Sequence, residues 1–158
     1  MSEVQTQLQV PVLVWIDDNN EYNQYEIQHA DSIGIQVIEL NSTAEAKAWV
    51  QANLEFIREN DQPSRLRFIS DNVRRETNER VGDYLNVDAG QSILRFLREQ
   101  SINAPVLIYT SASIDSTRYV ESFGAAGSTT SAEVCLRYIE NLSARKNNDV
   151  GWQEFYAW

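Results

Sequence analysis

The fold is decided by one stretch near the start of the chain, Val10-Pro11-Val12-Leu13-Val14-Trp15-Ile16-Asp17-Asp18-Asn19-Asn20. Its first part is a nearly unbroken apolar run, which is typical of a strand that is buried on both faces. The run then ends in two carboxylates and two amides. The stretch therefore predicts a central strand of a parallel sheet that leads into a polar loop.

Alternating strand and helix patterns follow this first strand. Apolar runs predict further strands over 35–40, 65–70, 104–109 and, more weakly, 125–129. Helical spacing of apolar residues predicts helices over 21–32, 43–56, 89–100, 116–123 and 131–143. Because right-handed crossovers place helices on both faces, this alternation predicts an α/β fold with a five-stranded, doubly wound parallel sheet. The charged segment 72–88 lacks periodicity and is predicted to be a long loop.

Composition restricts the class of protein. The chain has 158 residues and a net charge of −10, which predicts one domain whose field repels nucleic acid and anionic membranes. It shows no signal-peptide pattern and no apolar run near the roughly 18 residues of a membrane span, so we expect a cytoplasmic protein.

Cys135 and His29 are each the only residue of their type. We therefore exclude an internal disulfide and a multi-histidine zinc site, and we expect Cys135 in the core.

Polar side chains stand at the carboxyl ends of three predicted strands. Asp17 and Asp18 follow the first strand, Asp71 follows the third, and Thr110 and Ser111 follow the fourth. Ligand sites of such sheets lie beyond the carboxyl ends of the strands, so we expect these groups to converge. Clustered carboxylates repel one another unless a cation neutralises them, and Mg²⁺ prefers such oxygen ligands. The sequence therefore predicts a magnesium site where one carboxylate could accept a phosphoryl group.

These strand ends resemble a known family, the response-regulator receiver domains with their CheY-like (flavodoxin-like) fold. The segments that carry the resemblance are Val14-Trp15-Ile16-Asp17-Asp18-Asn19, Phe68-Ile69-Ser70-Asp71 and Val106-Leu107-Ile108-Tyr109-Thr110-Ser111. The resemblance covers roughly residues 10 to 143 and implies the strand order 2-1-3-4-5.

The resemblance also implies roles for individual residues. Asp71 would be the phosphoacceptor, and Thr110 would be the switch hydroxyl. Asp18 and Asp71 would bind Mg²⁺ together with the backbone carbonyl of Val73, while Asp17 would contact the metal through water. The implied partners are proteins of two-component signalling, such as a histidine kinase or a phosphotransfer protein, or an effector.

The chain departs from the family pattern at the fifth strand. Receiver domains usually carry a lysine there, which pairs with the phosphoryl oxygens, but the segment 124–131 contains none. Ser131 stands nearest the position of this lysine, and Ser128 stands where a switch aromatic usually lies. The missing cation removes a charge-assisted contact of about 1.5 to 3 kcal/mol.

Other residues could compensate for the missing lysine. Arg74, Arg75 and Arg80 lie in the 72–88 segment, and a guanidinium binds phosphate in a bidentate manner. We expect phosphoryl contacts from Arg74 and Arg75, and also from Ser111 and Ser131. The alternative for each arginine is that a charged loop is simply solvated.

Three classes of function remain open. The first is an atypical receiver-like module that signals through protein contacts, with phosphoryl acceptance at Asp71. The second is a constitutive pseudo-receiver that binds a partner without phosphorylation, which the missing lysine and Ser128 favour. The third is a metal-dependent phosphatase or nuclease, which ranks last because the chain offers no suitably placed His or Lys as a general acid or base. The expectation is a phosphoacceptor at most, not an enzyme.

The predicted domain organisation has three parts. An N-terminal extension covers 1–9, a receiver-like domain covers 10–144, and an aromatic tail covers 145–158. The tail, which gathers Trp152, Phe155, Tyr156 and Trp158, either packs on the domain or serves as a docking peptide. Packing is favoured because an exposed aromatic cluster is costly in a monomer.

Deletion of residues 151–158 should lower the melting temperature by several degrees if the tail packs on the domain. A loss of about 1 kcal/mol moves the melting temperature of a domain of this size by roughly 2 to 8 °C. Thermal unfolding followed by circular dichroism measures this shift. An unchanged melting temperature together with lost partner binding would mark the tail as a docking peptide.

Overall fold

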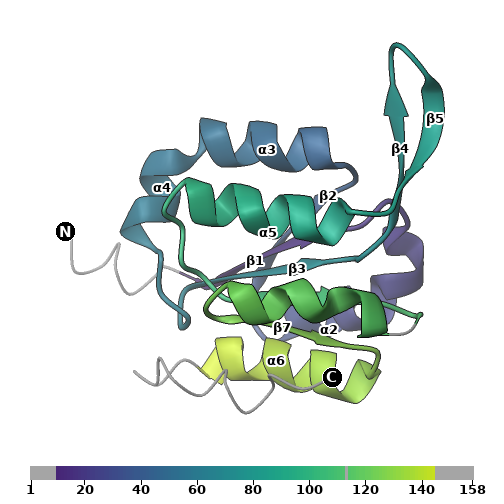
Figure 1. The fold of residues 1–158 in the computed structure, drawn as a ribbon. Coiled ribbons are helices and arrows are strands. Elements are labelled where there is room, and N and C mark those ends of the chain that lie inside the picture. Colours follow the sequence, from purple (N-terminus) through teal and green to yellow (C-terminus); the bar gives the residue numbers. More distant parts are fainter. Residues whose placement is uncertain (1–9, 113, 145–158) are drawn as a thin grey trace.

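The core of the protein is a parallel sheet of five strands in the order β2-β1-β3-β6-β7 (Figure 1). The computed structural model describes residues 10–112 and 114–144. The strands of the sheet are β1 (Val12–Ile16), β2 (Gln36–Leu40), β3 (Leu66–Ser70), β6 (Val106–Tyr109) and β7 (Ala126–Thr129). Counted along the sheet strands alone, this order is 2-1-3-4-5, so the predicted doubly wound parallel sheet is confirmed.

Helices cover both faces of the sheet and enclose two apolar clusters. Val12, Val14 and Ile16 of β1 point into one cluster, and Leu13 and Trp15 point into the other, as the alternation of a strand requires. The first cluster is covered by α3 (Thr43–Ala52), α4 (Leu54–Glu59), α5 (Ala89–Glu99) and the 3₁₀ helix η2 (Ile114–Ser122). The second is covered by α2 (Gln24–Ser32) and α6 (Ala132–Ala144).

The helices differ from their predicted form at three places. The first helix begins as a short 3₁₀ helix, η1 (Asn20–Asn23), before α2. The helix predicted over 43–56 is divided at Asn53, whose side-chain amide donates to the carbonyl of Trp49 (2.8 Å) and so competes with the helical pattern. The helix predicted over 116–123 is the 3₁₀ helix η2.

The two residues that are unique in their type lie on the α2–α6 side. Cys135 is buried in the core as predicted, and burial raises the pKa of its thiol. His29 of α2 pairs at 2.9 Å with Glu140 of α6, so it joins these two helices. Among the residues that the structure describes, no helix is both long enough and apolar enough to cross a membrane. The tail and the N-terminal extension lie outside the described residues.

The long loop predicted over 72–88 is wrong, because this segment contains an antiparallel hairpin. Its strands are β4 (Arg74–Asn78) and β5 (Gly82–Asn86), and they form a sheet of their own that projects from the body (Figure 1). Gly82 adopts a φ of 74° at the turn, a conformation that favours glycine.

Charged residues occupy the buried positions of β4, so the sequence shows no apolar pattern that would predict a strand here. Arg74 and Glu76 are buried, whereas Arg75 and Thr77 are exposed. The strand therefore has the period of two that half-buried strands show, but without apolar residues on its inner face.

Glu76 anchors the hairpin to the start of α3. Its carboxylate accepts hydrogen bonds from the backbone N–H and the hydroxyl of Thr43, the first residue of α3, and from the side-chain amide of Asn86. Burial pushes the pKa of Glu76 upward, but these hydrogen bonds and the Arg74 guanidinium outweigh burial and hold the pKa below its usual 4.5. The helix N-terminus adds to the preference for a negative charge at this place.

Glu76→Gln should loosen the hairpin from α3 near neutral pH. A neutral amide cannot replace charge-assisted hydrogen bonds, so we expect the free energy of unfolding to fall by about 1 to 3 kcal/mol. Because the folded pKa is lowered, the contribution of Glu76 is present above the usual 4.5 and is lost as pH falls through the lower folded pKa.

Urea unfolding at a series of pH values measures this effect. Wild type and Glu76→Gln should converge in acid, while the control Glu79→Gln, at an exposed position of the same hairpin, should match wild type throughout. A difference between wild type and Glu76→Gln that does not change with pH would contradict a role for the charge.

Candidate functional site

Three carboxylates meet at the carboxyl edge of the sheet, as predicted. Oxygen atoms of Asp17, Asp18 and Asp71 all lie within 4.8 Å of one another. Strand pairing brings them together, because the backbone N–H of Asp71 donates to the carbonyl of Ile16 (3.1 Å), which places the end of β3 beside the end of β1.

The carboxylates open onto a cavity of about 530 Å³. Thr110, Ser111 and Val73 line the same cavity, so the structure brings these predicted site residues to the acidic cluster. Tyr22 and Tyr109 also contribute to its wall. The space is of the size that small-ligand sites have, and it leaves room for a phosphoryl group beside Asp71.

Asp71 is the most buried of the three carboxylates, with 7% of its surface exposed. Burial raises the pKa of Asp71 to about 9, the Arg74 guanidinium opposes this rise, and the charges of Asp17 and Asp18 add to it. The ionised form of Asp71 therefore requires positive charge in its surroundings.

Arg74 supplies positive charge from the base of the hairpin. Its side chain is fully buried, and its Nη1 lies 3.0 Å from Asp71 Oδ1. Its Nη2 donates to the hydroxyl of Thr43 (3.3 Å), and its Nε lies 3.6 Å from Glu76 Oε1. One guanidinium thus connects the acidic cluster to the hairpin and to α3.

The other two carboxylates are positioned by neighbouring amides. Asp17 accepts from the backbone N–H of Asn19 (2.8 Å) and from the side chain of Asn23 (3.0 Å). Asp18 Oδ2 accepts from the backbone N–H of Arg75 (3.1 Å). The hairpin therefore touches the site twice, through the Arg74 side chain and through the Arg75 main chain.

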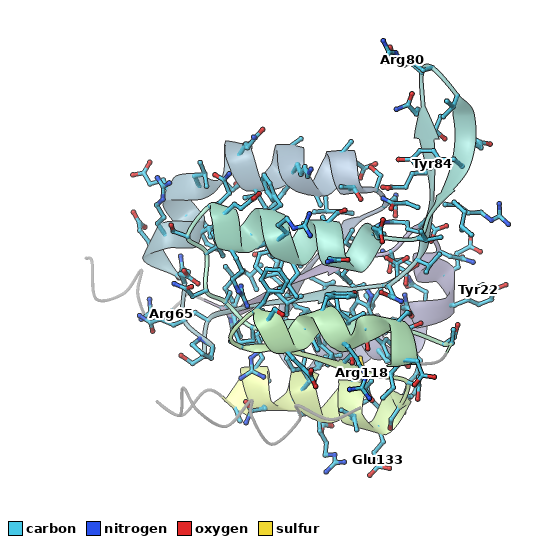
Figure 2. The ribbon with its side chains drawn as sticks, in the orientation of Figure 1. Tyr22, Arg65, Arg80, Tyr84, Arg118 and Glu133 are labelled. Carbon is cyan, nitrogen blue, oxygen red and sulfur yellow. The ribbon has the colours of Figure 1, made fainter. Side chains whose placement is uncertain are left out.

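Several predicted site residues have other contacts. The Ser131 hydroxyl accepts from the backbone N–H of Val134 (3.2 Å) at the start of α6, and the buried Ser128 hydroxyl pairs with that of Thr117 (2.7 Å). Arg75 is exposed, and Arg80 lies at the tip of the projecting hairpin (Figure 2). Of the arginines of this segment, it is Arg74 that the structure brings to Asp71.

A polar network behind Asp71 was not predicted from the sequence. The Asn72 side chain accepts from the Tyr119 hydroxyl (2.7 Å) and donates to the Ser116 hydroxyl (2.8 Å), so it ties the end of β3 to η2. Tyr109 at the end of β6 donates to Glu26 of α2 (2.9 Å). Each of these pairs joins residues far apart in sequence, and no local pattern could have revealed them.

The donor set fits a magnesium ion. Three carboxylates have oxygen atoms within 4.8 Å of one another, and they face a cavity with room for water ligands. Mg²⁺ prefers such oxygen ligands and usually keeps several waters. Arg74 lies against Asp71 from the hairpin side and provides part of the positive charge that the cluster needs.

Comparisons with known proteins identify the fold. No protein-family model matches the chain, and neither does any curated protein. Among solved structures, FixJ-N matches with a TM-score of 0.56 and 18% identity over 86% of this chain and 95% of that chain. A response regulator receiver domain from Clostridium thermocellum matches with a TM-score of 0.56 and 18% identity over 87% of this chain and 98% of that chain.

A third match is the beryllofluoride-activated NtrC receiver domain, with a TM-score of 0.55 and 14% identity over 89% of this chain and 99% of that chain. The MtaBC methanol:cobalamin methyltransferase complex from Methanosarcina barkeri also matches, with a TM-score of 0.57 and 15% identity over 95% of this chain and 53% of that chain. The chain therefore has the receiver-domain fold with an acidic aspartate cluster. The activity has to be argued from the site itself, because one fold can serve different functions.

Gly90→Ala should disturb the packing of α5 against the Asp71 main chain and the Tyr119 side chain. A Cβ at this position would lie 2.4 Å from the Tyr119 hydroxyl and 2.9 Å from the Asp71 carbonyl oxygen, so one of these groups has to move. We expect a loss of about 1 to 3 kcal/mol in the free energy of unfolding, as overpacking usually costs. The control Gly124→Ala meets no atom within 4 Å and should stay within about 0.5 kcal/mol of wild type. Equal stability of the two variants in urea unfolding would contradict the close packing at Gly90.

Proposed function

We propose that this chain is an atypical receiver-like signalling module that accepts a phosphoryl group at Asp71 and acts through protein–protein contacts. The observation that carries the proposal is the surroundings of the Asp71 carboxylate. It opens onto the cavity, lies within 4.8 Å of two further carboxylates, and has a buried arginine against it. A nucleophilic carboxylate, an acidic metal site and a fixed cation are the parts that phosphoryl acceptance needs.

Arg74 takes the role of the missing fifth-strand lysine in this proposal. It is buried and already contacts Asp71, but it does not line the cavity, so its planar guanidinium would have to turn toward the cavity to bind phosphoryl oxygens with two parallel hydrogen bonds. Ser131, which stands nearest the usual lysine position, offers no charge and has its hydroxyl engaged at the start of α6.

The proposed transfer is a displacement at phosphorus. An Asp71 oxygen attacks the phosphorus of a phosphohistidine-type donor, the bond between phosphorus and the donor breaks, and the donor leaves with its electron pair. Asp18, Asp71 and the Val73 carbonyl would hold Mg²⁺, with Asp17 contacting it through water, and the ion when bound would neutralise charge on the transferred oxygens. The Thr110 hydroxyl accepts from the N–H of Ala112 (3.2 Å), which leaves its proton to donate to the phosphoryl product.

The implied partners are a histidine kinase or phosphotransfer protein as donor and an effector protein that recognises the changed surface. Receiver domains are usually cytoplasmic, and the same location would hold for this chain. Direct contact with nucleic acid is disfavoured by the net charge of −10.

A second candidate is a constitutive pseudo-receiver that binds its partner without phosphorylation. It is favoured by the contacts that the chain's own groups make with two of the three carboxylates. Arg74 pairs with Asp71, and the N–H of Arg75 donates to Asp18. In that case the arginine would neutralise Asp71 in place of a metal ion, and the hairpin would stay in one position without a phosphoryl group.

Titration with magnesium and then with beryllofluoride tests the proposal. Trp15 is buried on β1 just before the two aspartates, and its ring lies 6.3 Å from that of Tyr109, which lines the cavity. We expect a saturable fluorescence change with magnesium and a further change with beryllofluoride, the latter absent in Asp71→Asn. No response in the folded protein would support the constitutive pseudo-receiver.

Arg74→Met and Arg75→Met form a matched pair for this titration. Loss of the buried guanidinium should weaken beryllofluoride binding by roughly 10- to 100-fold, because a charge-assisted contact contributes about 1.5 to 3 kcal/mol. Loss of the exposed Arg75 side chain should have little effect, since its contact with Asp18 is made by the main chain. Tighter binding in Arg74→Met would show that the arginine competes with the ligands instead of assisting them.

A further inference from the structure

The two strands of the hairpin have different surroundings. β4 is the inner strand, because its Arg75 N–H reaches Asp18 and its Glu76 side chain reaches α3. β5 pairs with β4 along one edge, and within the described part of the chain no strand pairs with its other edge. Figure 1 shows the hairpin projecting beyond the helices.

The outer edge of β5 presents main-chain groups that can pair with another strand. In an antiparallel ladder, residue pairs that exchange hydrogen bonds alternate with pairs whose main-chain groups point outward. Arg75 directs its N–H to Asp18, away from β5, and it lies opposite Leu85. The main-chain N–H and C=O groups of this pair therefore point away from the partner strand. By the same alternation, Leu85 and Asp83 direct their N–H and C=O groups away from β4.

Apolar side chains accompany this open edge. Leu85 is 53% exposed and Val87 is 62% exposed, and Tyr84, labelled in Figure 2, is 39% exposed on the opposite face of the strand. Natural proteins usually protect such an edge with lysine, proline or a covering segment. Residues 82–88 contain neither lysine nor proline, so the edge keeps its capacity for pairing.

We infer that the outer edge of β5 binds an extended, basic segment of a partner protein as an added strand. Main-chain hydrogen bonds would supply affinity, and Leu85 and Val87 would pack against alternate apolar side chains of the segment. Charge indicates the class of partner, because Asp83 and Asp88 are the charged residues of 82–88 and the whole chain has a net charge of −10, while the exposed Arg75 lies opposite Leu85 on the inner strand. Pairing with a second copy of β5 would bring two such acidic edges together and is therefore disfavoured.

Amide NMR of the full chain tests this inference with two synthetic probes, a short peptide that alternates Val and Lys and its counterpart that alternates Val and Glu. The Val–Lys peptide should bind saturably and shift the amide signals of residues 82–88, and the Val–Glu peptide should not. Shifts confined to the loop of Asp17 and Asp18 would show attraction to the acidic cluster alone and would overturn the inference. Concentration-dependent shifts of β5 without peptide would also overturn it, in favour of a second copy.

Leu85→Pro and Leu85→Ala separate main-chain pairing from side-chain packing. Proline removes an N–H that points outward, which edge strands tolerate, while alanine keeps that N–H and removes most of the side chain. We expect Leu85→Pro to weaken binding of the Val–Lys peptide at least 10-fold more than Leu85→Ala does. Equal binding by the two variants, with the signals of β4 unchanged in both, would rule out strand addition.

Discussion

The interaction on which the site depends is the ion pair between Arg74 and Asp71. Parallel strand pairing forces the ends of β1 and β3 together, and with them three carboxylates, one of which is almost fully buried. Burial and repulsion both disfavour the charged form of Asp71, so a cation must lie close to it. The chain provides that cation from an inserted hairpin, where a buried guanidinium is held by Asp71, Thr43 and Glu76.

This arrangement explains why the hairpin has charged residues on its inner face. A buried arginine is tolerated only where its charge is compensated, and Arg74 has carboxylates on two sides. Glu76 in turn has hydrogen bonds from Asn86 and from the start of α3. The hairpin is thus attached to the domain through polar contacts that continue from the acidic cluster, and not through the apolar core.

The sheet and the acidic cluster could be predicted from sequence, since both follow from local patterns. Apolar runs such as 12–16 give the strands, and the topology of a parallel sheet then places Asp17, Asp18 and Asp71 at one edge. The hairpin could not be predicted, because its buried positions are Arg74 and Glu76. Charged residues in a sequence indicate solvent exposure, and only the fold shows the partners that allow these two to be buried. The network of Asn72 and Tyr119 escaped for the same reason, since its members are joined by the fold and not by spacing.

The two proposals for this protein meet in the hairpin. Arg74 at its base contacts the residue proposed to accept a phosphoryl group, while β5 carries the edge proposed to bind a partner. A phosphoryl group on Asp71 would add negative charge and new acceptor oxygens next to Arg74, and would change the balance between its contacts with Asp71, Thr43 and Glu76. Because those contacts hold β4 against the domain, we expect the position of the proposed binding edge to respond to the charge in the cavity.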